Sequence, residues 1–193
     1  MSDHATMSEL LHRPSRPSRS GLAGTVSAGL IAGVLATMAK GRAEAWLQPV
    51  AERVWPPTDA EKRVPGADPA DHPENMPPSE IAERAVTAVD RDEADDADLV
   101  GAVGAQLHWG MGLGFAAAYA VAAGRYPRLR FGLGAPAGLA LYAATHGSTL
   151  PMAGLQPRPW KMPPAAVAWE VGSHVVYGMA LEALLRQQAR YTR

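Results

Sequence analysis

The sequence predicts an all-α integral membrane protein with four transmembrane helices in an antiparallel bundle. Four segments of the 193-residue chain are long, apolar and poor in charge, and about 20 such residues are needed to cross ~30 Å of hydrocarbon. Charge is also segregated along the chain, although the formal net charge is only −1. The mean hydropathy is slightly negative because it averages the apolar segments with two long polar ones.

The composition excludes several classes of function. The chain has no cysteine, so a disulfide, a thiolate nucleophile or a cysteine metal site is impossible. The near-neutral charge gives no reason to expect a nucleic-acid partner. No serine–histidine–aspartate arrangement, phosphate-binding loop or HExxH pattern is present, so we expect no enzyme, no cofactor and no metal.

The first half of the chain predicts one span and one polar segment. Residues 1–20 are polar and aperiodic, which is typical of a flexible tail. Residues 21–39 contain no charged residue and form the first span. Residues 40–98 contain 15 acidic and 7 basic residues, which predicts an acidic outer loop. Within that loop, Ser79–Asp90 has the apolar spacing of a short amphipathic helix.

The second half predicts three further spans, at 99–123, 131–150 and 165–185. The link between the second and third spans is so short that these helices must be antiparallel neighbours. We expect Pro136 to kink the third span.

The distribution of arginine predicts the orientation. The N-terminal tail, the 124–130 link and the C-terminal tail each contain three arginines, whereas the 40–98 loop has a net charge of −8. Cytoplasmic segments are enriched in Lys and Arg, so both termini are expected in the cytoplasm, with the chain embedded in the lipid bilayer. A soluble bundle of alanine-rich helices, or a cleaved signal peptide within residues 1–39, is the alternative.

Glycines at four-residue spacing predict close helix packing. Small residues let helix backbones approach each other in lipid, where no hydrophobic force drives association. We favour packing within the chain over dimerisation, although a homo-oligomer or a membrane partner stays open. The glycine pairs are Gly29 and Gly33, Gly110 and Gly114, and Gly134 and Gly138.

Five ionisable residues lie inside the predicted spans. Each costs about 2.5–3.5 kcal/mol to insert, so each needs a reason to be there. Glu170, His174, Gly178 and Glu182 follow a four-residue spacing and would form one polar ridge on the fourth span, with a gap at Gly178. The five residues are His108, His146, Glu170, His174 and Glu182.

Three interpretations of these residues stay open. The ridge could line a path for protons or a small polar solute, since the pKa of histidine is ordinarily near neutrality. His108 and His174 could bind a haem between them, or a metal together with Glu170. The polar groups could also pair only with one another. The corresponding functions are a channel, transporter or pH-responsive component, a haem- or metal-binding membrane protein, and a noncatalytic scaffold or partner subunit.

Lys40 and Glu44 lie one turn apart where the first span is expected to leave the membrane. An ion pair at a helix end contributes a few tenths of a kcal/mol, and we favour this interpretation over a charged mouth of a path.

Three stretches resemble the YagU-like inner membrane proteins. The stretch GLIAGVLATMAKGRAE (29–44) is similar to the first span of that family, and LPMAGLQPRPW (150–160) is similar to its link after the third span. The order Glu170, His174, Glu182, Arg186 matches the fourth span, and His108 and His146 match histidines of the second and third spans. The resemblance leaves out the N-terminal tail and most of the acidic loop.

This resemblance implies a four-span bacterial inner membrane protein of uncharacterised biochemical function. It supports the topology and draws attention to Lys40, Glu44 and the five ionisable residues. It implies no substrate.

Overall fold

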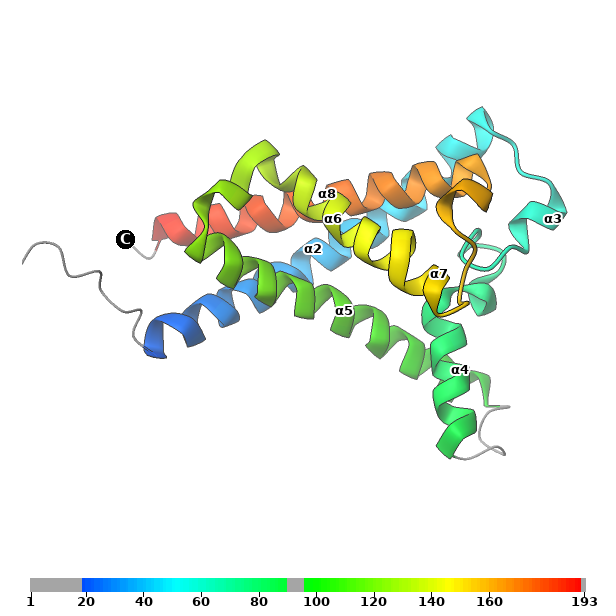
Figure 1. Cartoon of the computed structure of the whole chain (residues 1–193), viewed down its shortest axis with the longest axis horizontal. Helices are drawn as coiled ribbons and strands as arrows, with labels where there is room; N and C mark the ends of the chain where they lie inside the picture. The colour runs from blue at the N-terminus through cyan, green and yellow to red at the C-terminus, as the bar shows by residue number, and fades with distance from the viewer. Residues whose placement is uncertain (1–18, 90–95, 192–193) are drawn as a thin grey trace, which may run out of the picture.

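The computed structural model describes residues 19–89 and 96–191, and it confirms the prediction of an all-α protein. The described residues form helices and turns, with no strand among them. Four elements run roughly along the longest axis of the molecule (Figure 1): α2 (Arg19–Val54), α5 (Ala97–Arg125), α6 (Ala135–Ala144) and α8 (Pro164–Tyr191). Helix α2 packs against both α5 and α8, and α6 packs against α8. The predicted tail lies almost wholly outside the described residues.

Helix α2 is longer than the predicted first span, because it continues past residue 39 to Val54. The assignment of residues 40–54 to an outer loop is therefore wrong. Burial explains the extension: Gln48 and Ala51 are 5% and 7% exposed, and Ala51 packs in one cluster with Trp169 of α8. Lys40 consequently lies in the middle of a helix and not at its end.

Helix α5 begins at an aspartate cap and crosses α2 closely. The side chain of Asp96 accepts hydrogen bonds from the backbone N–H groups of Asp98 and Leu99, which satisfies two donors of the first turn. A Cβ added at Gly29 of α2 would lie 2.9 Å from the backbone of Ala116, and one added at Gly33 would lie 2.6 Å from its side chain. Glycine thus permits this crossing.

The predicted third span is not one continuous helix. A 3-10 segment, η3 (Pro127–Gly134), ends in three residues with left-handed backbone angles, and α6 starts after it. Pro136 lies in the first turn of α6, where its missing N–H is not needed, so the predicted kink there is wrong. A π-helical turn, η4 (Thr145–Thr149), and a short helix, α7 (Leu150–Met152), follow α6. A 3-10 turn, η5 (Pro159–Lys161), then precedes α8.

The rest of the predicted outer loop contains three short elements. These are α3 (Asp59–Lys62), η1 (Pro73–Asn75) and α4 (Pro77–Val89). Helix α4 coincides with the predicted Ser79–Asp90 helix as far as Val89 and starts two residues earlier. Residue 90 lies outside the described residues. It buries Ala82 and Val86, packs against α5 and lies across one end of the bundle (Figure 1).

Asp68 anchors this segment to α2. Its Oδ1 accepts hydrogen bonds from Gln48 Nε2 at 2.7 Å and from the backbone N–H groups of Ala70 and Asp71 at 3.0 Å. Its Oδ2 lies 3.2 Å from Lys62 Nζ. Burial alone would raise the pKa of the Asp68 carboxyl, but these hydrogen bonds and the Lys62 charge outweigh burial and hold the pKa below its ordinary value.

One described helix is both long and apolar enough to cross a membrane, over Gly21–Val54. Helix α6 has ten residues, and glycine and alanine dilute the apolar character of α5. Helix α8 contains two glutamates within its apolar stretch. These properties explain why the other three predicted spans give a weaker signal.

Candidate functional site

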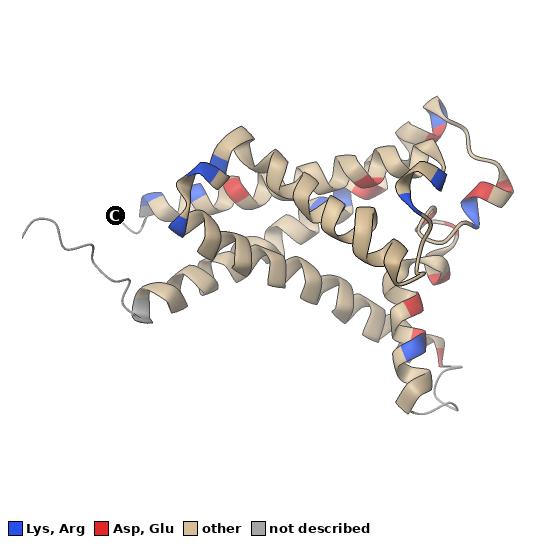
Figure 2. Cartoon of the chain, in the orientation of Figure 1, with Lys and Arg blue, Asp and Glu red and all other residues tan. Residues whose placement is uncertain are grey.

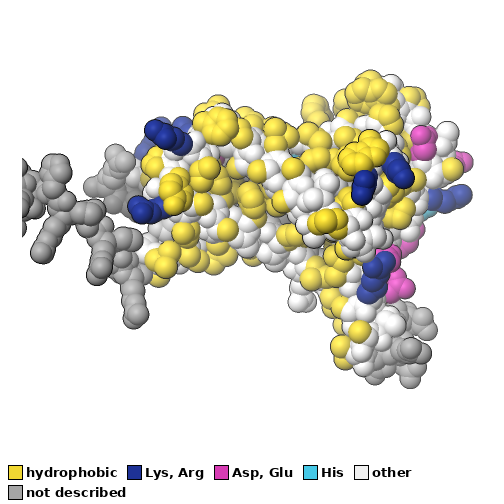
Figure 3. Space-filling model, in the orientation of Figure 1, with side chains coloured by type: hydrophobic (Ala, Val, Ile, Leu, Met, Phe, Trp, Pro, Cys, Tyr) yellow, Lys and Arg dark blue, Asp and Glu magenta, His cyan; other side chains and the backbone are white. Residues whose placement is uncertain are grey.

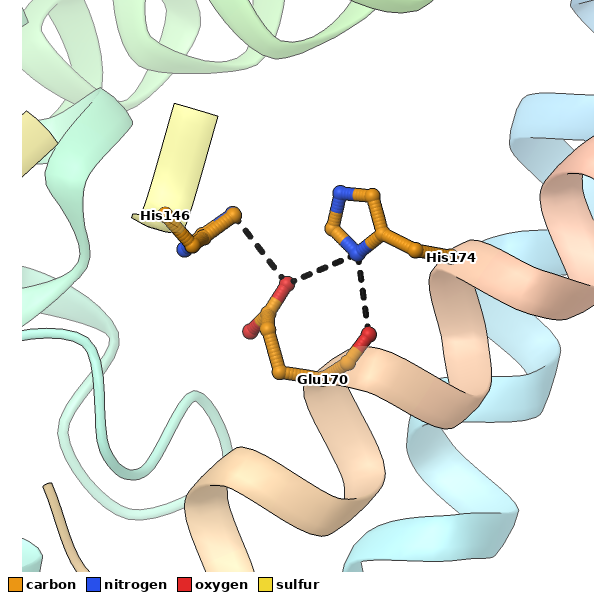
Figure 4. A group of neighbouring side chains, drawn as sticks. All are labelled: His146, Glu170 and His174. Carbon is orange, nitrogen blue, oxygen red and sulfur yellow. Dashed lines mark hydrogen bonds and ion pairs between the residues drawn. The ribbon is translucent and has the colours of Figure 1, made fainter. Parts of the chain in front are cut away.

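Helix α8 presents a buried carboxylate, Glu170, to groups from three elements. Figure 4 shows two of these groups, the imidazoles of His146 and His174. Glu170 Oε1 lies 3.2 Å from His146 Nε2, 3.4 Å from His174 Nδ1 and 3.5 Å from Lys40 Nζ. Lys40 also pairs with Glu44, one turn along α2. We call these five residues, Lys40, Glu44, His146, Glu170 and His174, the Glu170 cluster.

His146 has an oxygen against each of its ring nitrogens. The amide of Gln156 is oriented because its Nε2 donates to the His146 carbonyl at 3.1 Å, so its Oε1 faces His146 Nδ1 at 2.9 Å. An amide oxygen only accepts, and therefore Nδ1 bears a proton. A neutral imidazole has a single proton, so its Nε2 lone pair then faces the Glu170 carboxylate. This contact is attractive only with a cation, a proton or a metal ion, between the two atoms.

His174 is held by its own helix and by two rings. Its Nδ1 lies 2.9 Å from the carbonyl oxygen of Glu170, which only accepts, so this nitrogen donates. The ring packs edge-on against His146, with centroids 5.1 Å apart, and against Tyr142 at 5.6 Å. Tyr142 also stacks on His146. The prediction of a haem between His108 and His174 gains no support, because among the described residues His146 is the imidazole in contact with His174.

The π-helical turn η4 explains where His146 points. Such turns widen a helix locally and are frequent at functional sites. Hydroxyl groups accompany this one: Ser148 and Thr149 donate to the carbonyl of Ala144 at 2.8 and 2.6 Å. The turn therefore bonds its own carbonyls while it directs His146 toward α8.

Lys40 is a buried residue of this cluster and not the surface partner that the sequence predicted. Its side chain is 8% exposed, and Lys40 pairs with carboxylates of both α2 and α8. With both imidazoles neutral, Lys40 provides one positive charge against the two negative charges of Glu44 and Glu170. In that state the cluster is one positive charge short of neutrality, which a proton on His146 Nε2 or a bound cation would supply.

A cavity of about 310 Å³ adjoins the cluster. All five cluster residues border it, as does His108 of α5. The segment before and within α4 forms part of the wall, through residues that include Pro69 and Met76. This part of the segment between α2 and α5 therefore covers the cavity.

Glu182 lies in a separate place with different partners. It is 1% exposed and accepts a hydrogen bond from Tyr119 Oη at 2.9 Å. Arg186 Nε donates to it, and Arg130 Nη1 lies 3.8 Å away. We call these four residues, Tyr119, Arg130, Glu182 and Arg186, the Glu182 cluster.

Helix α6 packs against α8 at Gly178, the position at which the predicted ridge has a gap. A Cβ added at Gly178 would overlap the backbone of Gly134 and of Gly138. Conversely, a Cβ at Gly138 would overlap the carbonyl of His174. Backbone contact between α6 and α8 therefore separates the two clusters.

The predicted glycine pairs differ in how closely they are packed. Gly29, Gly33, Gly134 and Gly138 lie in tight contacts. Gly110 and Gly114 are exposed on α5, and an added Cβ would meet nothing within 4 Å. The prediction that these two glycines pack within the chain is therefore wrong.

Several residues of the two clusters were not singled out from the sequence. Gln156 is the one polar uncharged side chain in the proline-rich link after α7, and this isolation was a usable signal. Tyr142 precedes His146 by one helical turn. Tyr119 and Arg130 gave no signal, since their roles depend on contact with α8.

The donor atoms present could hold a metal ion. His146, Glu170 and His174 each offer one atom, and these atoms lie within 4.8 Å of one another. Imidazole and carboxylate groups suit several divalent transition metals.

Comparison with known proteins gives one match. No curated protein and no solved structure matches the chain significantly, so the resemblance to YagU-like proteins stays a prediction. The profile of a family described as "Protein of unknown function (DUF1440)" matches residues 34–183, which include the Glu170 cluster, the cavity and every residue of the Glu182 cluster except Arg186. The chain therefore belongs to the DUF1440 family.

Proposed function

We propose that the chain is a four-span protein of a bacterial inner membrane, in which the Glu170 cluster and its cavity bind a small cation or polar solute on a channel or transport path. One observation supports this function most directly: a buried cluster of two carboxylates, one lysine and two imidazoles borders a cavity of about 310 Å³. A purely structural polar cluster would be balanced and closely packed.

The surface supports a position in lipid. Large apolar side chains are exposed along all four long helices, whereas soluble monomers rarely expose contiguous apolar patches of more than a few hundred Å². Figure 3 shows a mainly hydrophobic central belt on one face, with charged side chains toward its two ends. Exposed residues of this kind are Leu30, Ile31, Val34, Leu35, Met38, Leu107, Trp109, Met111, Leu139 and Met179.

The ends of the molecule support the orientation. Lysine and arginine dominate at the end formed by η3 and the last turns of α8, and acidic residues gather at the opposite end around α3 and α4 (Figure 2). Cytoplasmic loops are enriched in basic residues. The arginine-rich end is therefore cytoplasmic in this proposal, and the cavity beneath α4 faces the outside.

Cation flux tests the function. The purified chain, reconstituted into liposomes, should admit at least one of K⁺, Mg²⁺ and Zn²⁺ faster than empty liposomes do. The double variant Glu170→Gln/His174→Ala should reduce this flux to the empty-liposome level. The matched control is His72→Ala/Glu74→Gln, because His72 and Glu74 form a similar pair, 3.1 Å apart, on the exposed outer segment. Equal flux in all three proteins would contradict the proposal.

A noncatalytic scaffold is the second candidate, and the open glycines on α5 favour it. Gly110 and Gly114 are exposed at four-residue spacing, which suits contact with another membrane helix. Disulfide cross-linking of a Gly110→Cys variant in membranes would detect a second copy. Cross-linking that Gly114→Leu abolishes would support the scaffold, and a monomer without flux would leave neither candidate.

A further inference from the structure

We propose that His146, Glu170 and His174 bind one divalent transition-metal ion, most suitably Zn²⁺. This inference names the cation of the proposed function and rests on it for the transport role, but metal binding itself rests on the geometry alone.

The contact between His146 Nε2 and Glu170 Oε1 favours a metal ion. Both atoms are acceptors once Gln156 holds the proton of His146 on Nδ1, yet they lie 3.2 Å apart in a buried place. A metal ion between them turns this repulsion into coordination. It also supplies the positive charge that the cluster lacks.

The distances between the ligand atoms also suit a metal ion. Zinc binds histidine nitrogen and carboxylate oxygen at about 2.0–2.2 Å in tetrahedral sites, so its ligand atoms are about 3.3–3.5 Å apart. The distances from Glu170 Oε1 to His146 Nε2 and to His174 Nδ1 are 3.2 and 3.4 Å. The third distance lies within 4.8 Å. The donors thus nearly have the spacing of a metal site before any ion enters.

Neighbouring groups hold the two imidazole rings in place. Metal-binding histidines usually donate their second N–H to an oxygen, which fixes the ring. Gln156 Oε1 does this for His146, and Tyr142 packs on both rings. His174 is the adjustable ligand: its Nδ1 proton is held by the Glu170 carbonyl. It coordinates once the neutral ring changes tautomer, with the proton on Nε2 and the lone pair on Nδ1, or once the ring turns over so that Nε2 is the ligand atom.

An ion can reach the three ligand residues from the cavity. The three ligand residues border the cavity, so the remaining coordination positions face open space. Metal sites that exchange water or substrate have such open positions, whereas structural zinc sites have four protein ligands. Two imidazoles and one carboxylate without a thiolate suit Zn²⁺ and its neighbours in the first transition row better than Mg²⁺ or Ca²⁺.

Metal binding by the purified full chain, with its purification tag removed, tests this inference. The chelator-treated protein is dialysed against Zn²⁺ and, separately, titrated with Co²⁺, whose visible absorption reports tetrahedral coordination. We expect one ion per chain and intense Co²⁺ bands. Both should be lost in His146→Ala and weakened at least about tenfold in Glu170→Gln.

Two controls separate a site from non-specific binding. His108→Ala alters another histidine on the same cavity, and His72→Ala alters an exposed one, so both should bind the metal like the unaltered chain. The thermal unfolding of each variant shows that it is folded. Metal binding that survives in a folded His146→Ala variant, or no binding by the unaltered chain, would overturn the inference and would assign a proton to the His146–Glu170 contact.

Flux in liposomes distinguishes this inference from the proposed function. Stoichiometric binding without flux supports the site and contradicts transport. Flux of K⁺ or Mg²⁺ by a chain that binds no Zn²⁺ overturns the metal site and leaves transport in place.

Discussion

The Glu170 cluster and the Glu182 cluster lie on the same helix, three turns apart, and differ in charge balance. Each contains a buried glutamate of α8 with cationic neighbours. Glu182 receives Tyr119, Arg130 and Arg186, so its negative charge is more than balanced. Glu170 shares Lys40 with a second carboxylate, Glu44, and is short of positive charge, next to a cavity, when its two imidazoles are neutral.

This difference shows why buried charge alone does not identify a functional site. A partnered buried ion pair fixes helix positions and leaves nothing to bind. A cluster with a charge deficit beside open space has both a reason and room to take up a cation. The backbone contact of Gly138 with His174, between the clusters, keeps these two environments apart.

The largest expected effect comes from that contact. Gly138→Ala would place a Cβ on the carbonyl of His174, and overpacking against a backbone cannot be relieved by a side-chain rotation. We expect a loss of more than about 3 kcal/mol, or no folded protein, in thermal unfolding in detergent. Gly114→Ala is the matched control and should change stability by at most ~0.5 kcal/mol. Equal effects of the two would contradict the separation of the clusters by α6.

The second largest loss of stability is expected when Lys40, the cation shared by Glu44 and Glu170, is removed. Lys40→Met leaves Glu44 without its cation and Glu170 with its two imidazoles only, and breaking a buried pair in this way costs about 3–5 kcal/mol. A double-mutant cycle sharpens the comparison. Lys40→Met and Glu170→Gln should couple by about 0.5–3 kcal/mol, whereas Lys40→Met and Glu182→Gln should be additive within ~0.5 kcal/mol. Coupling between Lys40 and Glu182 would mean that the two clusters act as one.

A smaller effect is expected at the residue that orients His146. Gln156→Leu removes the acceptor of the Nδ1 proton, and loss of such an outer partner typically weakens metal affinity about 10–100-fold. Equilibrium dialysis with Zn²⁺ measures this change. Gln106→Leu, on the exposed face of α5, is the matched control. Unchanged affinity in Gln156→Leu would remove Gln156 from the site.

The smallest effect concerns the outer segment and depends on pH. The pKa of Asp68 is held below its ordinary value of 3.8, so this group stabilises the fold above that value. The contribution disappears as the pH falls through the lower folded pKa. Asp68→Asn should cost about 1–2 kcal/mol at pH 7, at roughly 1 kcal/mol per hydrogen bond lost. The difference in thermal unfolding should shrink below about pH 4, and a constant difference down to about pH 2 would contradict the role of the Asp68 charge.

The local part of this arrangement could be predicted from the sequence. The apolar segments indicate an all-α protein, and four-residue spacing places Glu44 beside Lys40 and His174 beside Glu170. The sequence also indicates that glutamate and histidine inside apolar helices need an explanation.

The remaining features depend on tertiary packing. Nothing local reveals that Lys40 reaches Glu170, 130 residues away, or that Gln156 turns back to His146. A period of 3.6 residues describes one helix and not its neighbour, so the sequence indicates the gap at Gly178 but not that α6 packs into it. The extension of α2 to Val54 likewise depends on burial against α8, which outweighs the charged residues that suggested an end.

Water access to the cavity tests the central claim most directly, and the chain's lack of cysteine makes single-cysteine labelling clean. Thr37 borders the cavity, whereas Leu181 is 0% exposed in the core. Ala88 on α4 and Gly124 at the opposite end are exposed and mark the two sides. The account predicts that, in intact cells, a small polar thiol reagent modifies Ala88→Cys and Thr37→Cys but neither Gly124→Cys nor Leu181→Cys. A Thr37→Cys variant as inert as Leu181→Cys would contradict a cavity open to water beside the Glu170 cluster.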